Sequence, residues 1–246
     1  VTFSAPKTVS ILGIIDERFR EAHQLAVKEA FDYAQVNFAK ARETNEGMTV
    51  KVDTGNLIAV LFQHNTSREL DPQLHTHAVV MNMTKREDGE WRALSNERFF
   101  DGKMELGQAY RNSLARIITH EMGYSITYND KGLFEIMGLE KELIKAFSNR
   151  STQIESKVAE LREIYPNAGE QKLREWATLD SRIAKSDINI DEIRQDWLDR
   201  IKSFGFTPKT LIDSIEKVSE KTSTQALSAR SEEHTSELQS HGLISY

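Results

Sequence analysis

The spacing of apolar and polar positions near the start of the chain predicts a strand followed by two helices. A short apolar strand at Thr2 leads into a helix, whose start is marked by Ser4 as a cap and by Pro6 in the first turn. Over residues 17–42 apolar side chains recur about every 3.6 positions, which predicts a long helix closed by the Asn45–Gly47 turn.

Extended segments follow this helix. Residues 48–54 predict a short strand, and residues 57–64, which are apolar on both faces, predict a strand in the centre of a sheet. Residues 74–84 predict another strand, and residues 91–94 return after the Asp88–Gly89 turn as a hairpin.

The second half of the chain changes from mixed to helical periodicity. A helix is predicted at 104–122 and a hairpin at 124–136. Five further helices are predicted at 140–148, 151–164, 169–184, 191–204 and 208–221.

These elements predict an α+β fold with an antiparallel sheet and flanking helices. We divide the chain into a core over residues 1–137, a helical region over 138–222 and a tail over 223–246. The tail shows no apolar period and resembles the translation of a sequencing adapter, so we interpret it as an artefact. We expect the chain to be a fragment cut at both ends.

Composition narrows the possible chemistry. The apolar fraction of 39% and the charged fraction of 28% are typical of a folded domain. The absence of cysteine excludes disulfides, iron–sulfur clusters and a cysteine nucleophile. No secretory signal and no apolar run near the ~20 residues of a membrane span occur. The net charge of −6 argues mildly against nucleic-acid binding but does not exclude a local basic groove.

Three of the seven histidines lie within fourteen residues, at His64, His75 and His77. Alternate side chains of a strand share a face, so His75 and His77 point the same way, about 7 Å apart along the strand. If the preceding strand pairs antiparallel, His64 joins them. Three neutral imidazoles would leave the charge of a divalent metal intact, so that it could polarise a phosphate oxygen.

The residues alone leave other interpretations open. A histidine on a strand is more often packed or hydrogen-bonded than bound to metal. The same three side chains would suit a zinc hydrolase with Glu69 or Asp71 as its base, or a non-catalytic module that binds metal or single-stranded DNA.

The segment "FQHNTSRELDPQLHTHAVVMNMT" at 62–84 resembles the metal-binding motif of TrwC/TraI-type (MobF) conjugative relaxases, which are HUH endonucleases. The segments "TFSAPKTVSI" at 2–11, "TGNLIAVLFQHNTSR" at 54–68 and "YRNSLARIITHEMGY" at 110–124 are similar to other parts of that family. The resemblance covers about residues 1–210.

The resemblance implies an enzyme in which a tyrosine hydroxyl attacks the scissile phosphate of one strand at a plasmid transfer origin. It implies a five-stranded antiparallel palm with helical fingers, and one divalent ion (Mg, Mn or Zn) held by His64, His75 and His77. The implied partners are single-stranded origin DNA and, in a longer protein, a C-terminal helicase domain with relaxosome and type IV secretion components. The implied location is the bacterial cytoplasm.

The resemblance also suggests DNA contacts at Lys7, Ser67 and Arg68, which lie in the matching motifs. Cations of the helical region could contact phosphates as well, although each is also explained as a surface charge: Lys145, Arg150, Lys157, Arg174, Arg182 and Lys185.

The family places its nucleophilic tyrosines, and an aspartate that orients a ligand histidine, before the first motif. No tyrosine of this sequence matches the nucleophile motif, so we expect both groups upstream of Val1. We therefore expect this chain to bind metal and DNA without nicking.

Overall fold

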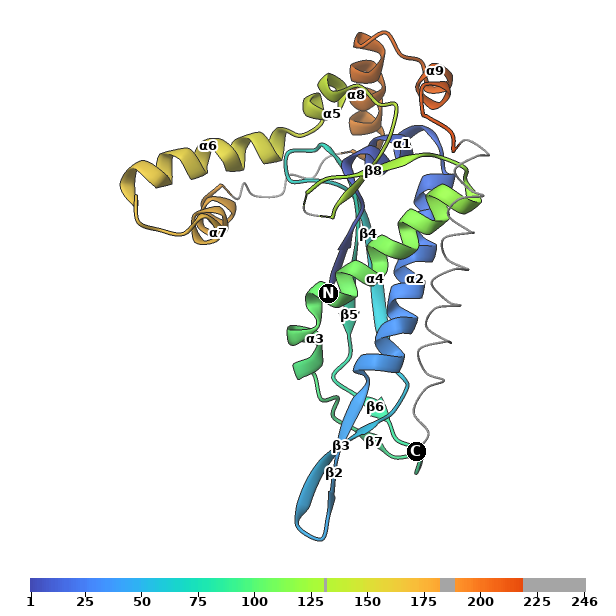
Figure 1. The fold of residues 1–246 in the computed structure, drawn as a ribbon, viewed down its shortest axis with the longest axis vertical. Coiled ribbons are helices and arrows are strands. Elements are labelled where there is room, and N and C mark those ends of the chain that lie inside the picture. Colours follow the sequence, from blue (N-terminus) through green and yellow to red (C-terminus); the bar gives the residue numbers. More distant parts are fainter. Residues whose placement is uncertain (131, 182–188, 219–246) are drawn as a thin grey trace, which may run out of the picture.

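The computed structural model describes residues 1–130, 132–181 and 189–218. Its main sheet is antiparallel, with the strand order β1-β5-β4. The strands are β1 (Thr2–Ser4), β4 (Ala59–Thr66) and β5 (Pro72–Val80). The predicted α+β class is confirmed, with a sheet and flanking helices visible in Figure 1.

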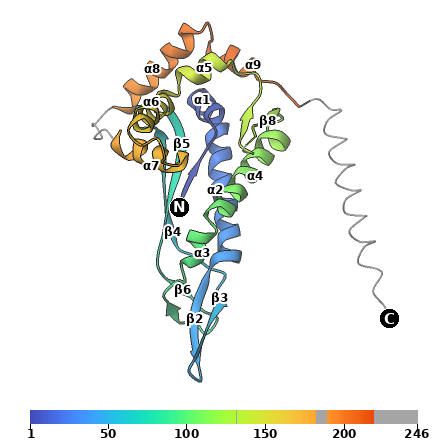
Figure 2. The same ribbon diagram turned by 60° about the vertical axis from the view of Figure 1, so that its left-hand side comes forward.

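Helices cover one face of this sheet. Helix α1 (Lys7–Ile15) follows β1 directly, while α2 (Arg18–Phe38) and α4 (Lys103–Arg116) lie side by side along the strands in both Figure 1 and Figure 2. Small buried side chains on α2 let the neighbouring backbones approach closely: Ala22, Ala26, Ala30 and Ala34. A π-helical turn, η1 (Ile117–Glu121), extends α4.

The prediction of a helix over residues 17–42 is wrong at its end. Helix α2 stops at Phe38, and β2 (Lys40–Asn45) pairs with β3 (Met48–Asp53) as a hairpin that projects at the bottom of Figure 1. Its two-residue turn has φ of 50° at Glu46 and 80° at Gly47, which matches the twist of the flanking strands. The strand pairing therefore prevails over continued helical periodicity.

The prediction that residues 57–64 form a central strand is also wrong. Strand β4 pairs only with β5 among the described residues, and β5 occupies the centre of the sheet. The described main sheet accordingly has three strands, not the expected five. Val60, Leu61 and Phe62 of β4 are each about half exposed.

The remaining elements follow the predicted order. Short hairpins form from β6 (Thr84–Lys85) with β7 (Trp91–Arg92) and from β8 (Ile126–Tyr128) with β9 (Phe134–Ile136). The other helices are α3 (Glu97–Asp101), α5 (Lys141–Ala146), α6 (Asn149–Ile164), α7 (Glu170–Asp180), α8 (Ile190–Ser203) and α9 (Pro208–Asp213). Helix α9 is thus shorter than the predicted 208–221.

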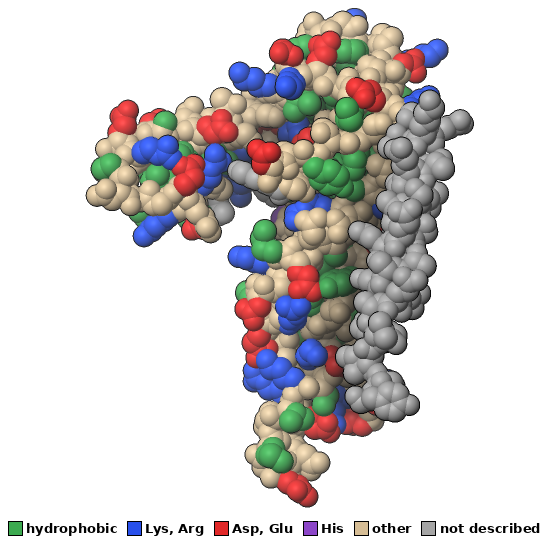
Figure 3. All heavy atoms as spheres, viewed as in Figure 1, with side chains coloured by type: hydrophobic (Ala, Val, Ile, Leu, Met, Phe, Trp, Pro, Cys, Tyr) green, Lys and Arg blue, Asp and Glu red, His purple; other side chains and the backbone are tan. Residues whose placement is uncertain are grey.

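The buried apolar side chains form one large and one small cluster. One hydrophobic core joins the sheet and α1, α2 and α4 to the later helices through Leu143, Trp197 and Leu211. Helices α6 and α7, which we call the arm, carry a separate small cluster built on Val158, Leu173 and Ala177. Figure 3 shows the surface hollowed between the arm and the rest of the molecule.

Two earlier expectations concern other parts of the chain. The predicted artefactual tail at 223–246 lies outside the described residues. Within the residues that the structure covers, no helix is long and apolar enough to cross a membrane.

Candidate metal and DNA site

The sheet register brings the predicted histidines together. His64 of β4 lies directly opposite His75 of β5, and Phe62 lies opposite His77. The ring centres of the three histidines are 5.0–5.3 Å apart. The three side chains therefore converge on one face of the sheet. Thr76 points to the opposite face, where its hydroxyl contacts His23 of α2.

Hydrogen bonds orient two of the three rings. Nδ1 of His75 lies 2.9 Å from the carbonyl oxygen of Gln73, so this nitrogen carries a proton and donates it. Nδ1 of His77 lies 2.9 Å from the hydroxyl of Thr2 on β1. The Gln73 carbonyl can only accept, so it fixes the tautomer of His75 in which Nε2 can serve as a ligand, and the Thr2 hydroxyl orients the His77 ring.

The donor set fits a divalent metal in kind and in spacing. An imidazole bound through one nitrogen at ~2.1 Å puts its ring centre roughly 3.2 Å from the ion, so tetrahedral ligands have ring centres about 5 Å apart. The observed separations of 5.0–5.3 Å agree. Among the described residues, however, no group of three or more His, Asp or Glu side chains already has the full arrangement of a metal site.

A buried polar chain lies on the opposite side of the same strand. His23 of α2 contacts the Thr76 hydroxyl through Nε2 at 2.8 Å and the Tyr110 hydroxyl through Nδ1 at 2.7 Å. Burial, with a smaller contribution from His75, lowers the pKa of His23 to about 4, and burial raises the pKa of Tyr110. Sequence reasoning missed this group, although His23 falls on the apolar face of a predicted helix.

The loop between β4 and β5 explains the position of Ser67. Its buried hydroxyl accepts hydrogen bonds from the backbone N–H of Glu69 and of Asp71, both at 3.2 Å. Leu70 adopts a left-handed φ of 59° within this turn. Ser67 thus shapes the loop, whereas Arg68 is exposed next to it. DNA contacts by either residue stay predictions.

The helix start at Lys7 is already occupied by internal partners. The carboxylate of Glu135 on β9 accepts hydrogen bonds from the backbone N–H groups of Lys7 and Thr8. The Lys7 ammonium donates to the carbonyl of Pro72 at 2.9 Å, and burial lowers its pKa. The DNA contact predicted for Lys7 stays a prediction, but its cation is committed to the start of β5.

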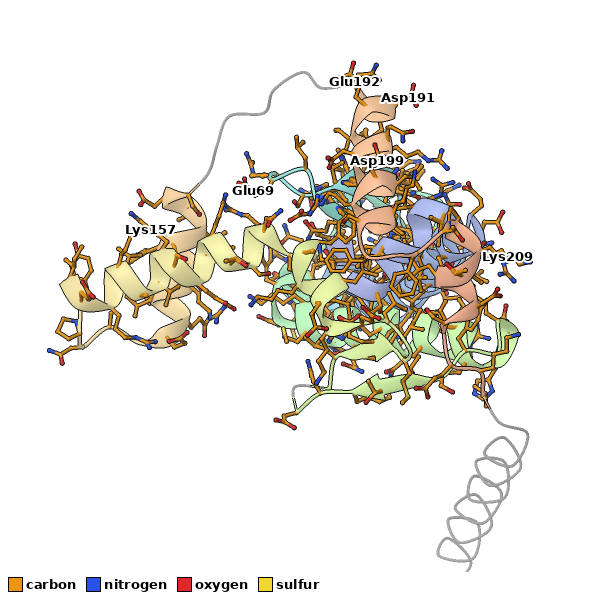
Figure 4. All side chains as sticks on the ribbon, turned by 90° about the horizontal axis from the view of Figure 1, so that it is seen from above. Glu69, Lys157, Asp191, Glu192, Asp199 and Lys209 are labelled. Atoms are coloured by element: carbon orange, nitrogen blue, oxygen red, sulfur yellow. The ribbon has the colours of Figure 1, made fainter. Side chains whose placement is uncertain are left out.

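Asp71 joins the β4–β5 loop to the later helices. Its side chain is fully buried and accepts a hydrogen bond from the Asn149 amide at 3.0 Å, with Arg200 at 3.5 Å. The backbone N–H of Arg150 also points at it, so Asp71 caps the start of α6. Neighbouring Glu69, labelled in Figure 4 between the arm and α8, lies 3.8 Å from Arg150.

Of the four cations proposed for the helical region that the structure describes, three are engaged with carboxylates or carbonyls. Lys157 bridges Glu160 and Asp180, and Arg174 pairs with Glu170. Arg150 donates to the carbonyl oxygens of Thr178 and Ser181. Arg182 and Lys185 lie outside the described residues.

Comparison with known proteins gives concordant matches. Residues 1–204 match the model of the family described as TrwC relaxase. The chain is 33% identical over 229 residues to the multifunctional conjugation protein TraI of Escherichia coli K12, covering 88% of this chain and 12% of TraI. A second E. coli TraI is also 33% identical, over 232 residues. The chain thus spans about an eighth of these relatives.

Solved structures agree with the family match. A metal-bound structure of the conjugative relaxase TrwC with OriT DNA is 37% identical, with a TM-score of 0.75, covering 84% of this chain and 71% of that chain. A copper-bound structure of the same complex is also 37% identical, with a TM-score of 0.77, covering 84% and 70%.

Proposed function

The chain belongs to the TrwC relaxase family, and from that membership we propose that it is part of an enzyme that nicks and transfers one strand of plasmid DNA at a transfer origin. We assign a divalent ion, Mg, Mn or Zn, to His64, His75 and His77. The observation that carries the assignment is the convergence of these rings, with centres 5.0–5.3 Å apart, on one exposed sheet face.

The chain's own residues provide binding and orientation. The Gln73 carbonyl holds the His75 ring in one tautomer, and the Thr2 hydroxyl orients the His77 ring. The rigid central strand β5 keeps the two rings on one face. When bound, the ion would withdraw charge from a phosphate oxygen.

The zinc-hydrolase alternative lacks support because its base candidates are used elsewhere. Asp71 is buried against Asn149 and Arg200, and Glu69 faces Arg150. The helicase, relaxosome and secretion partners and the cytoplasmic location stay predictions.

Calorimetric titration with Mn²⁺ or Zn²⁺ tests the metal assignment. We expect His75→Ala and His77→Ala each to weaken binding at least 10-fold, since each removes one of three ligands. His120→Ala is the matched control, because His120 is an exposed histidine on η1. Equal affinities for all three variants and the unchanged protein would exclude this site.

Incubation with single-stranded origin DNA and Mn²⁺ tests whether the chain nicks. We expect binding without a covalent protein–DNA adduct, since no tyrosine of this sequence matches the nucleophile motif and three tyrosine hydroxyls are engaged away from His64, His75 and His77. Tyr33 donates to Glu105, Tyr110 contacts His23, and Tyr124 accepts from Arg18. An adduct in denaturing electrophoresis would contradict this expectation, and peptide mapping would identify the tyrosine.

A further inference from the structure

An apolar strip continues the histidine-bearing face of the sheet. Side chains at alternate positions of a strand share a face, so the face that carries His64 on β4 and His77 on β5 also carries the neighbours two, four and six residues away. On this face lie Ile58, Val60, Phe62, Val79 and Met81, which we call the apolar strip.

The strip is exposed along its whole length. Its members have exposed fractions between 36% for Ile58 and 56% for Val79. Isolated exposed apolar residues are ordinary, but a contiguous row on one face marks a binding surface.

Phe62 joins the strip to the histidines. It lies directly opposite His77 in the register, so the two Cβ atoms are about 5 Å apart. It precedes His64 by two positions on the same face, roughly 7 Å along the strand. An aromatic ring, half exposed, thus borders the proposed metal ligands.

We propose that the apolar strip is a base platform for single-stranded DNA: Phe62 stacks on a base next to the phosphate at the histidines, and Val60 and Val79 support its neighbour. This inference rests on the proposed function. Unpaired bases have apolar faces that stack on aromatic side chains without sequence preference, which suits a half-exposed phenylalanine. The phosphates are charged and gain no binding energy from apolar side chains, so the bases are the part of the strand that suits this surface.

Continuity with the histidines favours DNA over a protein segment as the occupant. A strand held by its phosphate at these rings has its adjoining bases within reach of Phe62. The structures of TrwC hold OriT DNA, which supports a nucleic-acid ligand.

Fluorescence anisotropy with Mn²⁺ and two labelled probes tests the platform. One probe is a 12-nucleotide oligothymidylate, and the other has the same backbone with abasic sites throughout. We expect Phe62→Ala to weaken oligothymidylate binding between about 5-fold and about 100-fold, while leaving the abasic strand unchanged. Phe62→Trp should retain the affinity. Phe100→Ala is the matched control, because Phe100 on α3 is 71% exposed.

The outcomes separate this inference from the proposed function. Equal affinities of Phe62→Ala and Phe100→Ala for oligothymidylate would overturn the platform while leaving DNA binding intact. Equal weakening of both probes by Phe62→Ala would also overturn it, since the loss would then not involve bases. If the unchanged protein bound neither probe, the proposed function would fail as well. Circular dichroism of each variant verifies that it is folded.

Discussion

At the scale of single residues, His23 makes the stability of the protein depend on pH. Its folded pKa of about 4 lies below the usual value of 6.5, so the folded protein holds it neutral. As pH falls below 6.5, His23 becomes protonated in the unfolded chain but stays neutral in the folded protein, so the free energy of unfolding falls until about pH 4. The loss attributable to His23 is about 3 kcal/mol. Urea denaturation across this range measures it.

The matched variants for this residue are His23→Gln and His120→Gln. Gln at position 23 removes the titration, so we expect a flatter dependence of the unfolding free energy between pH 6.5 and pH 4, whatever its effect at pH 7. His120 is exposed, so its variant should keep the slope of the unchanged protein. A slope unaffected by His23→Gln would assign the pH dependence to other groups.

At the scale of elements, Asp71 holds the β4–β5 loop to the start of α6 and to α8. Asp71→Ala removes a fully buried carboxylate and leaves Asn149 and the mostly buried Arg200 without it. We expect unfolding free energy to fall by about 3 kcal/mol. Asp88→Ala is the control, since Asp88 pairs with Arg86 in an exposed turn and should cost under about 1 kcal/mol. Equal losses in urea denaturation would show that Asp71 does not join these elements.

Periodicity predicted the type of most elements but not how they are paired. The hairpin of β6 and β7 followed from Asp88–Gly89, because the turn chemistry is local. The end of α2 did not, since Lys40–Asn45 gains its strand partner from residues that follow it. An apolar run such as that of β4 looks the same whether a strand or a ligand covers it.

In the candidate site, too, the local features could be predicted from the sequence and the contacts between distant residues could not. The spacing of His75 and His77 predicted a shared face, and an assumed antiparallel pairing added His64, as the register shows. The partners of Lys7 could not be predicted, because Glu135 is 128 residues away in sequence. The chain Tyr110–His23–Thr76 likewise depends on tertiary packing.

At the scale of the whole molecule, the arm should be less stable than the part of the fold built on the main core. Its own cluster is small and separate from the main core. Local opening needs little free energy where few apolar contacts are lost. Hydrogen exchange followed by mass spectrometry should therefore show faster exchange in α6 and α7 than in α2 and β5. Equal protection throughout would mean that the arm opens only with the entire fold.

Glu135 gives the first turn of α1 an internal counter-ion. Sulfate, heparin or nucleotide would have to displace the Glu135 carboxylate from the backbone N–H groups of this turn. This carboxylate belongs to the same chain, so we expect anions to bind weakly at the helix start. Polyanions should consequently bind on the histidine side of the sheet and not at the start of α1, although Ser4, Pro6 and Lys7 are typical of an anion-binding helix start.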